Sequence, residues 1–165
     1  MLSKAMQDAV NDQIRKEFAS AYLYLAMSAH CEAADFPGCA HWLRLQNQEE
    51  TGHAMKLLDY VNNRGGRVAL QAIDQPPGKF RSPLDVFQQT LDHERKVTES
   101  IHKLYALAVK ENDYATQTIL HWFITEQVEE EKRATDLVAQ FRLAGDEGAA
   151  LLFLDRQLAG RSAGK

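Results

Sequence analysis

Apolar residues recur at steps of three, four or seven through most of the chain, and this spacing is typical of helices that bury one face. In the first long segment the repeat runs through Met6, Val10, Ile14, Ala21 and Tyr24. No segment shows the alternation of apolar and polar residues that marks a half-buried strand. The pattern therefore predicts an all-α protein.

Turn and capping residues divide this pattern into separate helices. Proline and glycine interrupt it at 35–38, 65–66 and 76–78, Ser82-Pro83 is a good helix start, and Gly145 is a good residue to end a helix. The sequence thus predicts four long helices and a short fifth one within a single domain, residues 1–165. The expected helices are 3–32, 37–64, 83–111, 113–144 and 147–159.

The lengths of the links set the expected topology. The first and third links are short, so the helices that they join should run antiparallel. The link at residues 65–82 is long enough to reach about 59 Å when it is extended at about 3.3 Å per residue. Because such a link spans the length of the bundle, the second and third helices can run parallel. We therefore expect a four-helix bundle with one long crossover and a short C-terminal helix.

The charge balance argues against nucleic acid or an anionic membrane as a partner. The 165 residues include 23 Asp and Glu against 19 Lys and Arg, which gives a formal net charge of −4. Excess acid disfavours binding to nucleic-acid phosphates or to an anionic membrane surface. No uncharged run approaches the ~20 residues of a transmembrane helix, and the N-terminus does not read as a secretory signal. We expect a cytoplasmic protein in which Cys31 and Cys39 are reduced thiols.

Each long helix carries one glutamate inside its apolar stripe. Positions seven apart in a helix differ by only about 20° around the axis, and large apolar residues flank these glutamates at that spacing. The four acids and their neighbours are Glu17 (Val10, Tyr24), Glu50 (Leu43, Leu57), Glu94 (Phe87, Ile101) and Glu130 (Phe123, Leu137). Glu131 passes the same test, with Ile124 and Val138, so the test alone does not define a site.

A histidine accompanies one of these acids. Glu50 and His53 are three residues apart and so share one helix face. A second Glu-x-x-His pair, Glu99 and His102, lies about 140° from Glu94 around its helix, and we expect it on the outer surface. Several carboxylates in a bundle core would destabilise the fold unless they bind a metal ion. Carboxylates with one imidazole suit iron or manganese.

Four stretches together resemble the bacterial non-haem ferritins, in the ferritin-like di-iron family, over essentially the whole chain. They are Arg15-Lys16-Glu17 through Tyr24, Gln48-Glu49-Glu50-Thr51-Gly52-His53, His93-Glu94, and Trp122 through Glu126-Gln127-Val128-Glu129-Glu130-Glu131-Lys132. The resemblance implies a ferritin-like bundle with an iron-oxidising centre inside each subunit. It also implies that Glu17, Glu50 and His53 bind the first iron, and that Glu50, Glu94 and Glu130 bind the second.

The same resemblance assigns roles around this centre. It places Gln127 in the dioxygen pocket and Tyr24 beside the irons as a hydrogen-bond partner. It also implies a third iron site, formed by Glu49, Glu126, Glu129 and Glu130. Thr51 stands where bacterioferritins carry a haem-ligating methionine, and the fourth helix has Gln127 in place of the Glu of a second Glu-x-x-His motif, so no haem is expected.

The resemblance further implies an activity and an assembly. Proteins of this group oxidise Fe(II) with dioxygen and store Fe(III) mineral inside a shell of 24 identical subunits. We therefore expect a ferroxidase that serves iron storage and detoxification. The short apolar fifth helix should be buried between subunits. The sequence does not indicate a reductant protein for iron release.

Two other functions fit part of the pattern. A bacterioferritin-like protein, or another di-iron carboxylate oxidase without a storage role, would use the same bundle and a similar site. A non-catalytic helical scaffold would carry the acids incidentally and would bind no metal. The size of the particle in solution separates a shell-forming ferritin from a small oxidase and from a scaffold.

Overall fold

Five helices make up most of the computed structural model, which describes residues 2–163. They are α1 (Lys4–Ala33), α2 (Pro37–Asn63), α3 (Pro83–Lys110), α4 (Tyr114–Ala144) and α5 (Gly148–Ala159). The described range contains no strand, so the predicted all-α fold class is confirmed. None of its helices is long and apolar enough to cross a membrane.

Local sequence signals explain several helix ends. The Asp85 backbone N–H donates to Ser82 Oγ at 3.1 Å, which caps α3. The Thr116 backbone N–H donates to an Asp113 carboxylate oxygen at 3.1 Å, which caps α4. Gly145 ends α4 with a φ of 56°, a left-handed conformation that costs glycine little. The breaks in the apolar pattern therefore coincide with capped ends.

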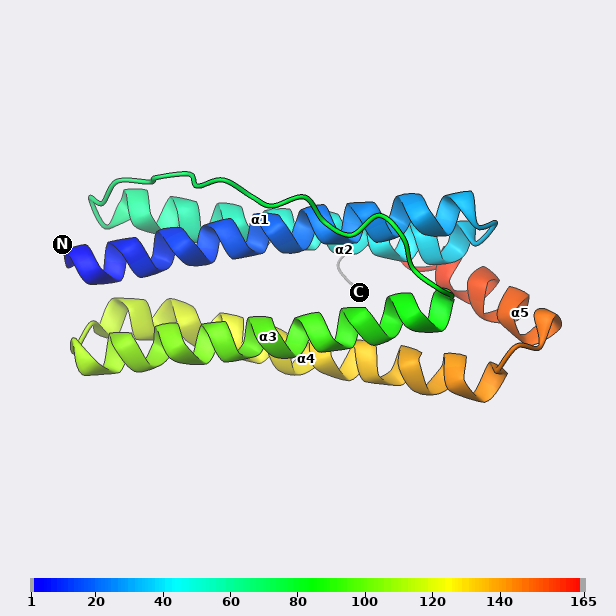
Figure 1. Ribbon diagram of the computed structural model, residues 1–165. Helices are drawn as coiled ribbons and strands as arrows, with labels where there is room; N and C mark the ends of the chain where they lie inside the picture. The colour runs from blue at the N-terminus through cyan, green and yellow to red at the C-terminus, as the bar shows by residue number, and fades with distance from the viewer. Residues whose placement is uncertain (1, 164–165) are drawn as a thin grey trace.

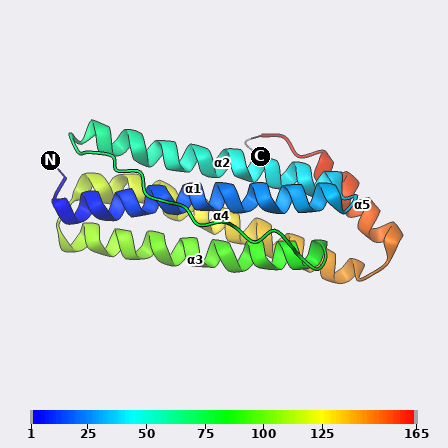
Figure 2. The same cartoon turned by 45° about the horizontal axis from the view of Figure 1, so that its top comes forward.

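The link between α2 and α3 is a long crossover that runs along the bundle, so that these two helices point the same way (Figures 1 and 2). Side chains of α1 hold its first part in place. Asn11 donates to the Arg67 carbonyl at 3.0 Å and accepts from the Ala69 N–H at 3.1 Å, while Gln7 accepts from the Arg67 N–H at 2.7 Å. The predicted topology of four helices with one long crossover is thereby confirmed.

The core consists of two apolar clusters with a polar layer between them. The N-terminal cluster includes Met6, Ile14, Leu57, Ile101 and Phe123. The α5-end cluster includes Met27, Leu43, Phe87, Phe141 and Leu158. On each long helix, the residues of this polar layer lie in sequence between the residues of these two clusters. The polar layer is formed by Glu17, Gln46, Glu50, His53, Glu94, Gln127 and Glu130.

The fifth helix closes one end of the bundle, where it packs against α2 and α4 (Figure 1). Asp155 is buried there, and its Oδ1 accepts a hydrogen bond from the Cys39 backbone N–H at 2.8 Å. This contact caps α2, whose own N-cap residue Phe36 makes no side-chain hydrogen bond. A Cβ at Gly38 would lie 1.7 Å from the Asp155 carbonyl oxygen, so only glycine permits this close approach.

Candidate metal centre

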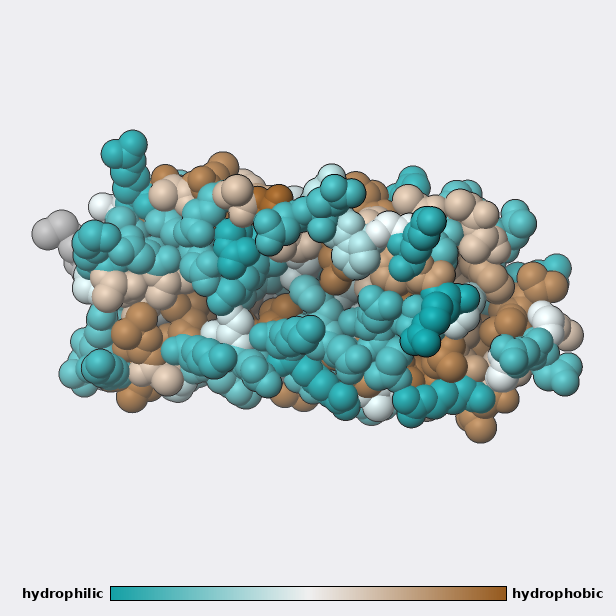
Figure 3. Space-filling view, in the orientation of Figure 1, coloured by the Kyte–Doolittle hydropathy of each residue, from teal (hydrophilic) through white to brown (hydrophobic). Residues whose placement is uncertain are grey.

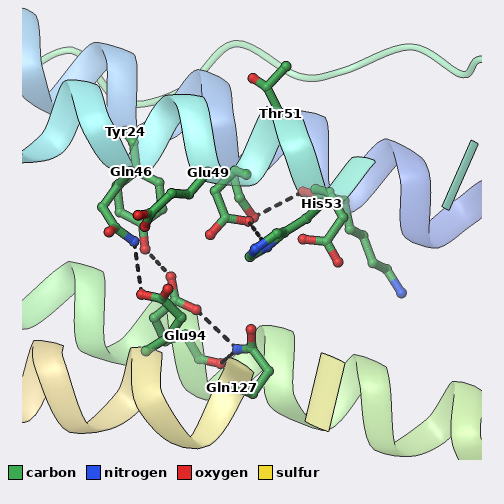
Figure 4. Close-up of polar contacts among 12 residues, drawn as sticks. Tyr24, Gln46, Glu49, Thr51, His53, Glu94 and Gln127 are labelled. Atoms are coloured by element: carbon green, nitrogen blue, oxygen red, sulfur yellow. Dashed lines mark hydrogen bonds and ion pairs between the residues drawn. The ribbon is translucent and has the colours of Figure 1, made fainter. Parts of the chain in front are cut away.

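The polar layer brings together the glutamates that interrupt the four apolar stripes. Glu17 comes from α1, Glu50 from α2, Glu94 from α3 and Glu130 from α4, and each is at most 2% exposed. His53, on the same face of α2 as Glu50, is 7% exposed. Figure 4 shows the labelled members of this group reaching from both helix pairs into the space between them. Burial of this many ionisable groups requires compensating charge or protonation.

Three of these residues form a compact group. One potential ligand atom each from Glu17, Glu50 and His53 lies within 4.8 Å of the other two. His53 Nδ1 is 3.5 Å from Glu50 Oε2. Glu50 Oε1 is buried and has no hydrogen-bond partner among the described residues, although leaving such an oxygen unpaired costs about 1–3 kcal/mol or more. An unpaired carboxylate oxygen beside a second carboxylate and an imidazole fits a divalent cation.

Glu94 and Glu130 complete the layer but are held by hydrogen-bond donors. Glu94 accepts a hydrogen bond from the Tyr24 hydroxyl on one oxygen and, at 3.1 Å, from Gln127 Nε2 on the other. Glu130 accepts from Gln46 Nε2 at 2.9 Å and from Arg133 Nη1 at 3.1 Å. Tyr24 and Gln127 therefore both contact Glu94 in the polar layer, and their roles at an iron centre stay predictions.

Burial sets the protonation of the layer. Burial raises the pKa of Glu17, and it raises the pKa of Glu94 to about 7. Burial also raises the pKa of Glu50, and the negative charges of the neighbouring Glu94 and Glu17 raise the pKa of Glu50 further. Burial also lowers the pKa of His53 to about 4, so its imidazole is neutral at physiological pH. A neutral imidazole is the form that binds a metal, and a bound cation would displace protons from the carboxyl groups.

A chain of hydrogen bonds supports Glu17 from the side of α3. Gln13 Nε2 donates to Glu17 Oε1 at 2.7 Å, and Ser100 Oγ donates to Gln13 Oε1 at 2.6 Å. Lys16 Nζ in turn donates to Ser100 Oγ at 2.8 Å. The apolar pattern of the sequence did not predict a role for these residues or for Gln46. The available signal was spacing, because Gln13 and Gln46 each precede a site glutamate by four residues and so share its helix face.

Aromatic rings cover the outer side of His53. Its ring meets those of Trp122 and Phe123 edge-on, with centroids 5.3 and 5.9 Å away. The ammonium group of Lys56 lies 3.9 Å from the centroid of the Trp122 ring. The imidazole is therefore shielded from solvent on this side, which keeps it neutral. The second Glu-x-x-His pair differs, since Glu99 and His102 are both exposed, as expected.

The acids predicted to form a third iron site lie outside this compact group. Glu49 and Glu126 are half-buried and Glu129 is exposed. With His53 and Trp122 they line a surface pocket of about 660 Å³ between α2 and α4. Within residues 2–163, the geometry brings together only Glu17, Glu50 and His53 as a possible three-residue metal group. The third site stays a prediction.

Comparison with known proteins gives consistent matches over nearly the whole chain. The family model described as "Ferritin-like domain" matches residues 7–144. The chain is 43% identical over 161 residues to a bacterial non-heme ferritin of Bacteroides fragilis (strain 638R), covering 98% of this chain and 100% of that relative. A bacterial non-heme ferritin of Staphylococcus haemolyticus (strain JCSC1435) is 38% identical over 162 residues, which is 98% of each chain.

Solved structures agree with the family match. A crystal structure described as a novel open pore ferritin, from the hyperthermophilic archaeon Archaeoglobus fulgidus, aligns with a TM-score of 0.97 and 46% sequence identity. The alignment covers 98% of this chain and 100% of that one. The likeness therefore extends to the helices that carry the polar layer and to α5.

Proposed function

This chain belongs to the ferritin-like domain family, as its resemblance to bacterial non-haem ferritins predicted, and on that premise we propose that it is an iron-storage ferritin with ferroxidase activity. The observation that carries the proposal is the buried group of Glu17, Glu50 and His53, in which Glu50 Oε1 lacks a partner within the described part of the chain. A scaffold with incidental acids would place them at the edges of its helices, where water solvates them.

Fe(II) is the substrate of the proposed reaction. We assign one ion to Glu17, Glu50 and His53, and a second to Glu94 and Glu130, with Glu50 bridging the two. Each Fe(II) gives one electron to dioxygen, which takes up two protons, so that two Fe(II), one dioxygen and two protons yield two Fe(III) and one hydrogen peroxide. Carboxylates suit both oxidation states of iron because they are hard ligands.

The chain's own residues prepare this centre in distinct ways. Gln13 orients Glu17, while the Tyr24 hydroxyl and the Gln127 amide fix both oxygens of Glu94. We place Gln127 at the dioxygen pocket. The aromatic wall of Trp122 and Phe123 keeps the His53 imidazole neutral and ready to bind. Binding of Fe(II) displaces the protons that the buried carboxyls hold.

Assembly into a shell of 24 subunits is part of the proposal, and α5 supports it. Leu152 is 52% exposed and Phe153 is 68% exposed on this helix. Figure 3 shows hydrophobic side chains gathering at the end of the bundle where α5 lies. A monomer gains nothing from such exposure, whereas a subunit contact would bury it. A cytoplasmic location also remains an expectation, as does release of stored iron by an unidentified reductant.

The assembly is tested by sizing two altered chains. Deletion of residues 146–165 should prevent formation of the shell, and a truncated chain that still forms full-size particles would contradict the assignment of α5. Because deletion also removes the Asp155 contact with α2, Phe153→Asp provides a second test in which that contact remains. This variant should be helical by circular dichroism but fail to reach the size of the wild-type particle.

The ferroxidase proposal is tested by adding Fe(II) aerobically to metal-free protein and then sizing the product. An amber, soluble particle of several hundred kilodaltons is expected. Glu17→Ala and His53→Ala should each slow the initial oxidation at least ~tenfold, because each removes a ligand, while the shell still assembles. His102→Ala is the matched control, since it removes the exposed histidine of the other Glu-x-x-His pair. Unchanged rates in both ligand variants would contradict the site.

A further inference from the structure

An arginine of α4 lies among the acids that the family resemblance assigns to a third iron. Arg133 Nη1 donates to Glu130 Oε1 at 3.1 Å and lies 3.5 Å from Glu49 Oε2. Its other amino group, Nη2, donates to Glu129 Oε2 at 3.3 Å. One guanidinium group thus pairs with three of the four predicted ligands. Arg133 is partly shielded, with 29% of its side chain exposed.

A second arginine, in the segment that follows α5, reaches Glu49, one of the same acids. Arg161 Nη2 donates to Glu49 Oε2 at 2.8 Å, and only 8% of the Arg161 side chain is exposed. Its guanidinium group lies 4.5 Å from the centroid of the Trp42 ring, and Nη1 donates to the Trp42 carbonyl at 3.4 Å. His41 Nε2 contacts the Arg161 carbonyl at 2.9 Å. Stacking, ion pairing and backbone contacts therefore fix this charge beside Glu49.

The di-iron centre and the predicted third site consequently differ in whether their carboxylate oxygens are already paired with cations. At the di-iron centre, Glu50 Oε1 has no partner among the residues described, and the neighbouring ligand atoms lie close together. At the outer acids, which are Glu49, Glu126 and Glu129, Glu49 Oε2 already has two cationic partners, and an oxygen of Glu129 is paired with Arg133. A divalent ion that used these oxygens would have to displace charge-assisted hydrogen bonds and face the repulsion of nearby guanidinium groups.

Arg133 also links the polar layer to the surface pocket. It contacts the fully buried Glu130 of the polar layer, and it lines the pocket that Glu49, Glu126 and Glu129 share. We propose that Arg133, supported by Arg161, is the resident counter-ion of these outer acids and excludes a third divalent metal ion. Each subunit then holds two metal ions at its centre, and the outer acids serve as partners of the arginines. This inference rests on the di-iron centre proposed above.

The test is an anaerobic titration of the metal-free assembled protein with Co(II), followed by calorimetry and by the visible absorption of bound Co(II). The wild-type protein should bind two ions per subunit. Arg133→Met removes the charge and keeps an apolar stem of similar length, so a third ion should bind. Arg133→Lys should restore a count of two, because it returns a cation. Arg142→Met is the matched control, since Arg142 lies on α4 and pairs with Gln88 far from the acids.

In the single variant, Arg161 could still exclude a third ion. The double variant Arg133→Met with Arg161→Met therefore removes both cations. A third ion in the single or the double variant supports the proposal. Three ions in the wild-type protein, or only two in the double variant, would overturn it while leaving the di-iron centre intact. Fewer than two ions in the wild-type protein would contradict the proposed di-iron centre itself, and the inference with it.

Discussion

The same four helices place apolar side chains in the core at the two ends of the bundle and polar side chains in the core at its middle. At the α5 end the inward positions are apolar, and Phe87 stacks on Phe141 with ring centroids 4.9 Å apart. In the middle the inward positions carry carboxyl groups whose pKa values are raised by burial. The apolar ends stabilise the fold and hold the helices in register. The buried carboxyl groups of the middle destabilise it unless a metal ion binds there.

The apolar cluster at the α5 end should contribute most to stability. Phe141→Ala should lower the free energy of unfolding of the metal-free protein by about 3–5 kcal/mol, because it removes a fully buried ring and leaves a cavity. Chemical denaturation measures the change. Leu143→Ala, at a position of α4 that is 89% exposed, is the control and should change stability by less than ~0.5 kcal/mol. A loss below ~1 kcal/mol for Phe141→Ala would mean that the ends do not dominate stability.

The buried carboxyl groups of the polar layer should make the stability of the metal-free protein depend on pH. Burial raises the pKa of Glu94 from 4.5 to about 7, so between these values the folded chain holds a proton that the unfolded chain has released. The contribution of Glu94 to the stability of the metal-free protein should therefore fall as the pH rises through this window, by up to ~1.4 kcal/mol per pH unit. Melting temperatures from pH 4.5 to 7.5 test the sign, and Glu94→Gln should flatten the slope. Because the lowered pKa values of His53 and His93 contribute a slope of opposite sign, the difference between the two proteins isolates Glu94. An unchanged slope in Glu94→Gln would contradict a protonated Glu94.

A buried acid at the α5 end differs from the acids of the polar layer, because a backbone N–H pairs with it. Asp155 accepts a hydrogen bond from the Cys39 N–H and caps α2, so this carboxylate should stabilise the fold without metal. Asp155→Ala should cost about 1–2 kcal/mol in the metal-free protein, measured by denaturation. Asp146→Ala, at an exposed position of the turn before α5, is the control. If Asp155→Ala instead made the protein more stable, Asp155 would destabilise the fold as the buried acids of the polar layer do.

The smallest expected effect concerns the support of Glu17. Ser100→Ala removes the hydroxyl that donates to Gln13, so Glu17 should be oriented less well. We expect a loss of stability under ~1 kcal/mol and Co(II) affinity that is weaker by up to ~tenfold. His102→Ala, two residues along the same helix and exposed, should leave both quantities unchanged. If Ser100→Ala left the affinity unchanged as well, the hydrogen-bond chain would have no positioning role.

Most of the fold was predictable because its signals are local. The observed ends of α1 to α5 lie within one residue of the expected ones, since Ser82, Asp113 and Gly145 act on their own helix ends. The site glutamates were detectable because they break an apolar stripe. The same pattern could not separate Glu130 from Glu131. In the structure, the Glu130 side chain is only 2% exposed, whereas Glu131 is half-buried and accepts a hydrogen bond from Thr98 Oγ1 at 2.6 Å.

The remaining contacts depend on tertiary structure. Arg161 reaches Glu49 only because α5 folds back against α2, and the two residues are 112 positions apart. Gln13 and Ser100 meet across two helices that are adjacent only in the bundle. An amide or a hydroxyl at the edge of an apolar stripe is common on any helix, so neither residue stands out in the sequence. The acids were therefore identifiable from the chain, but the groups that orient or neutralise them were not.

We propose that the polar layer binds two metal ions and that the outer acids bind no third one. Crystals soaked anaerobically in Fe(II) and measured on both sides of the iron absorption edge would locate each ion directly. We expect two anomalous peaks per subunit, one among Glu17, Glu50 and His53 and one between Glu94 and Glu130, with Arg133 still paired to Glu130 or Glu129. A map with no peak inside the layer, or with its strongest peak among Glu49, Glu126 and Glu129, would contradict this assignment.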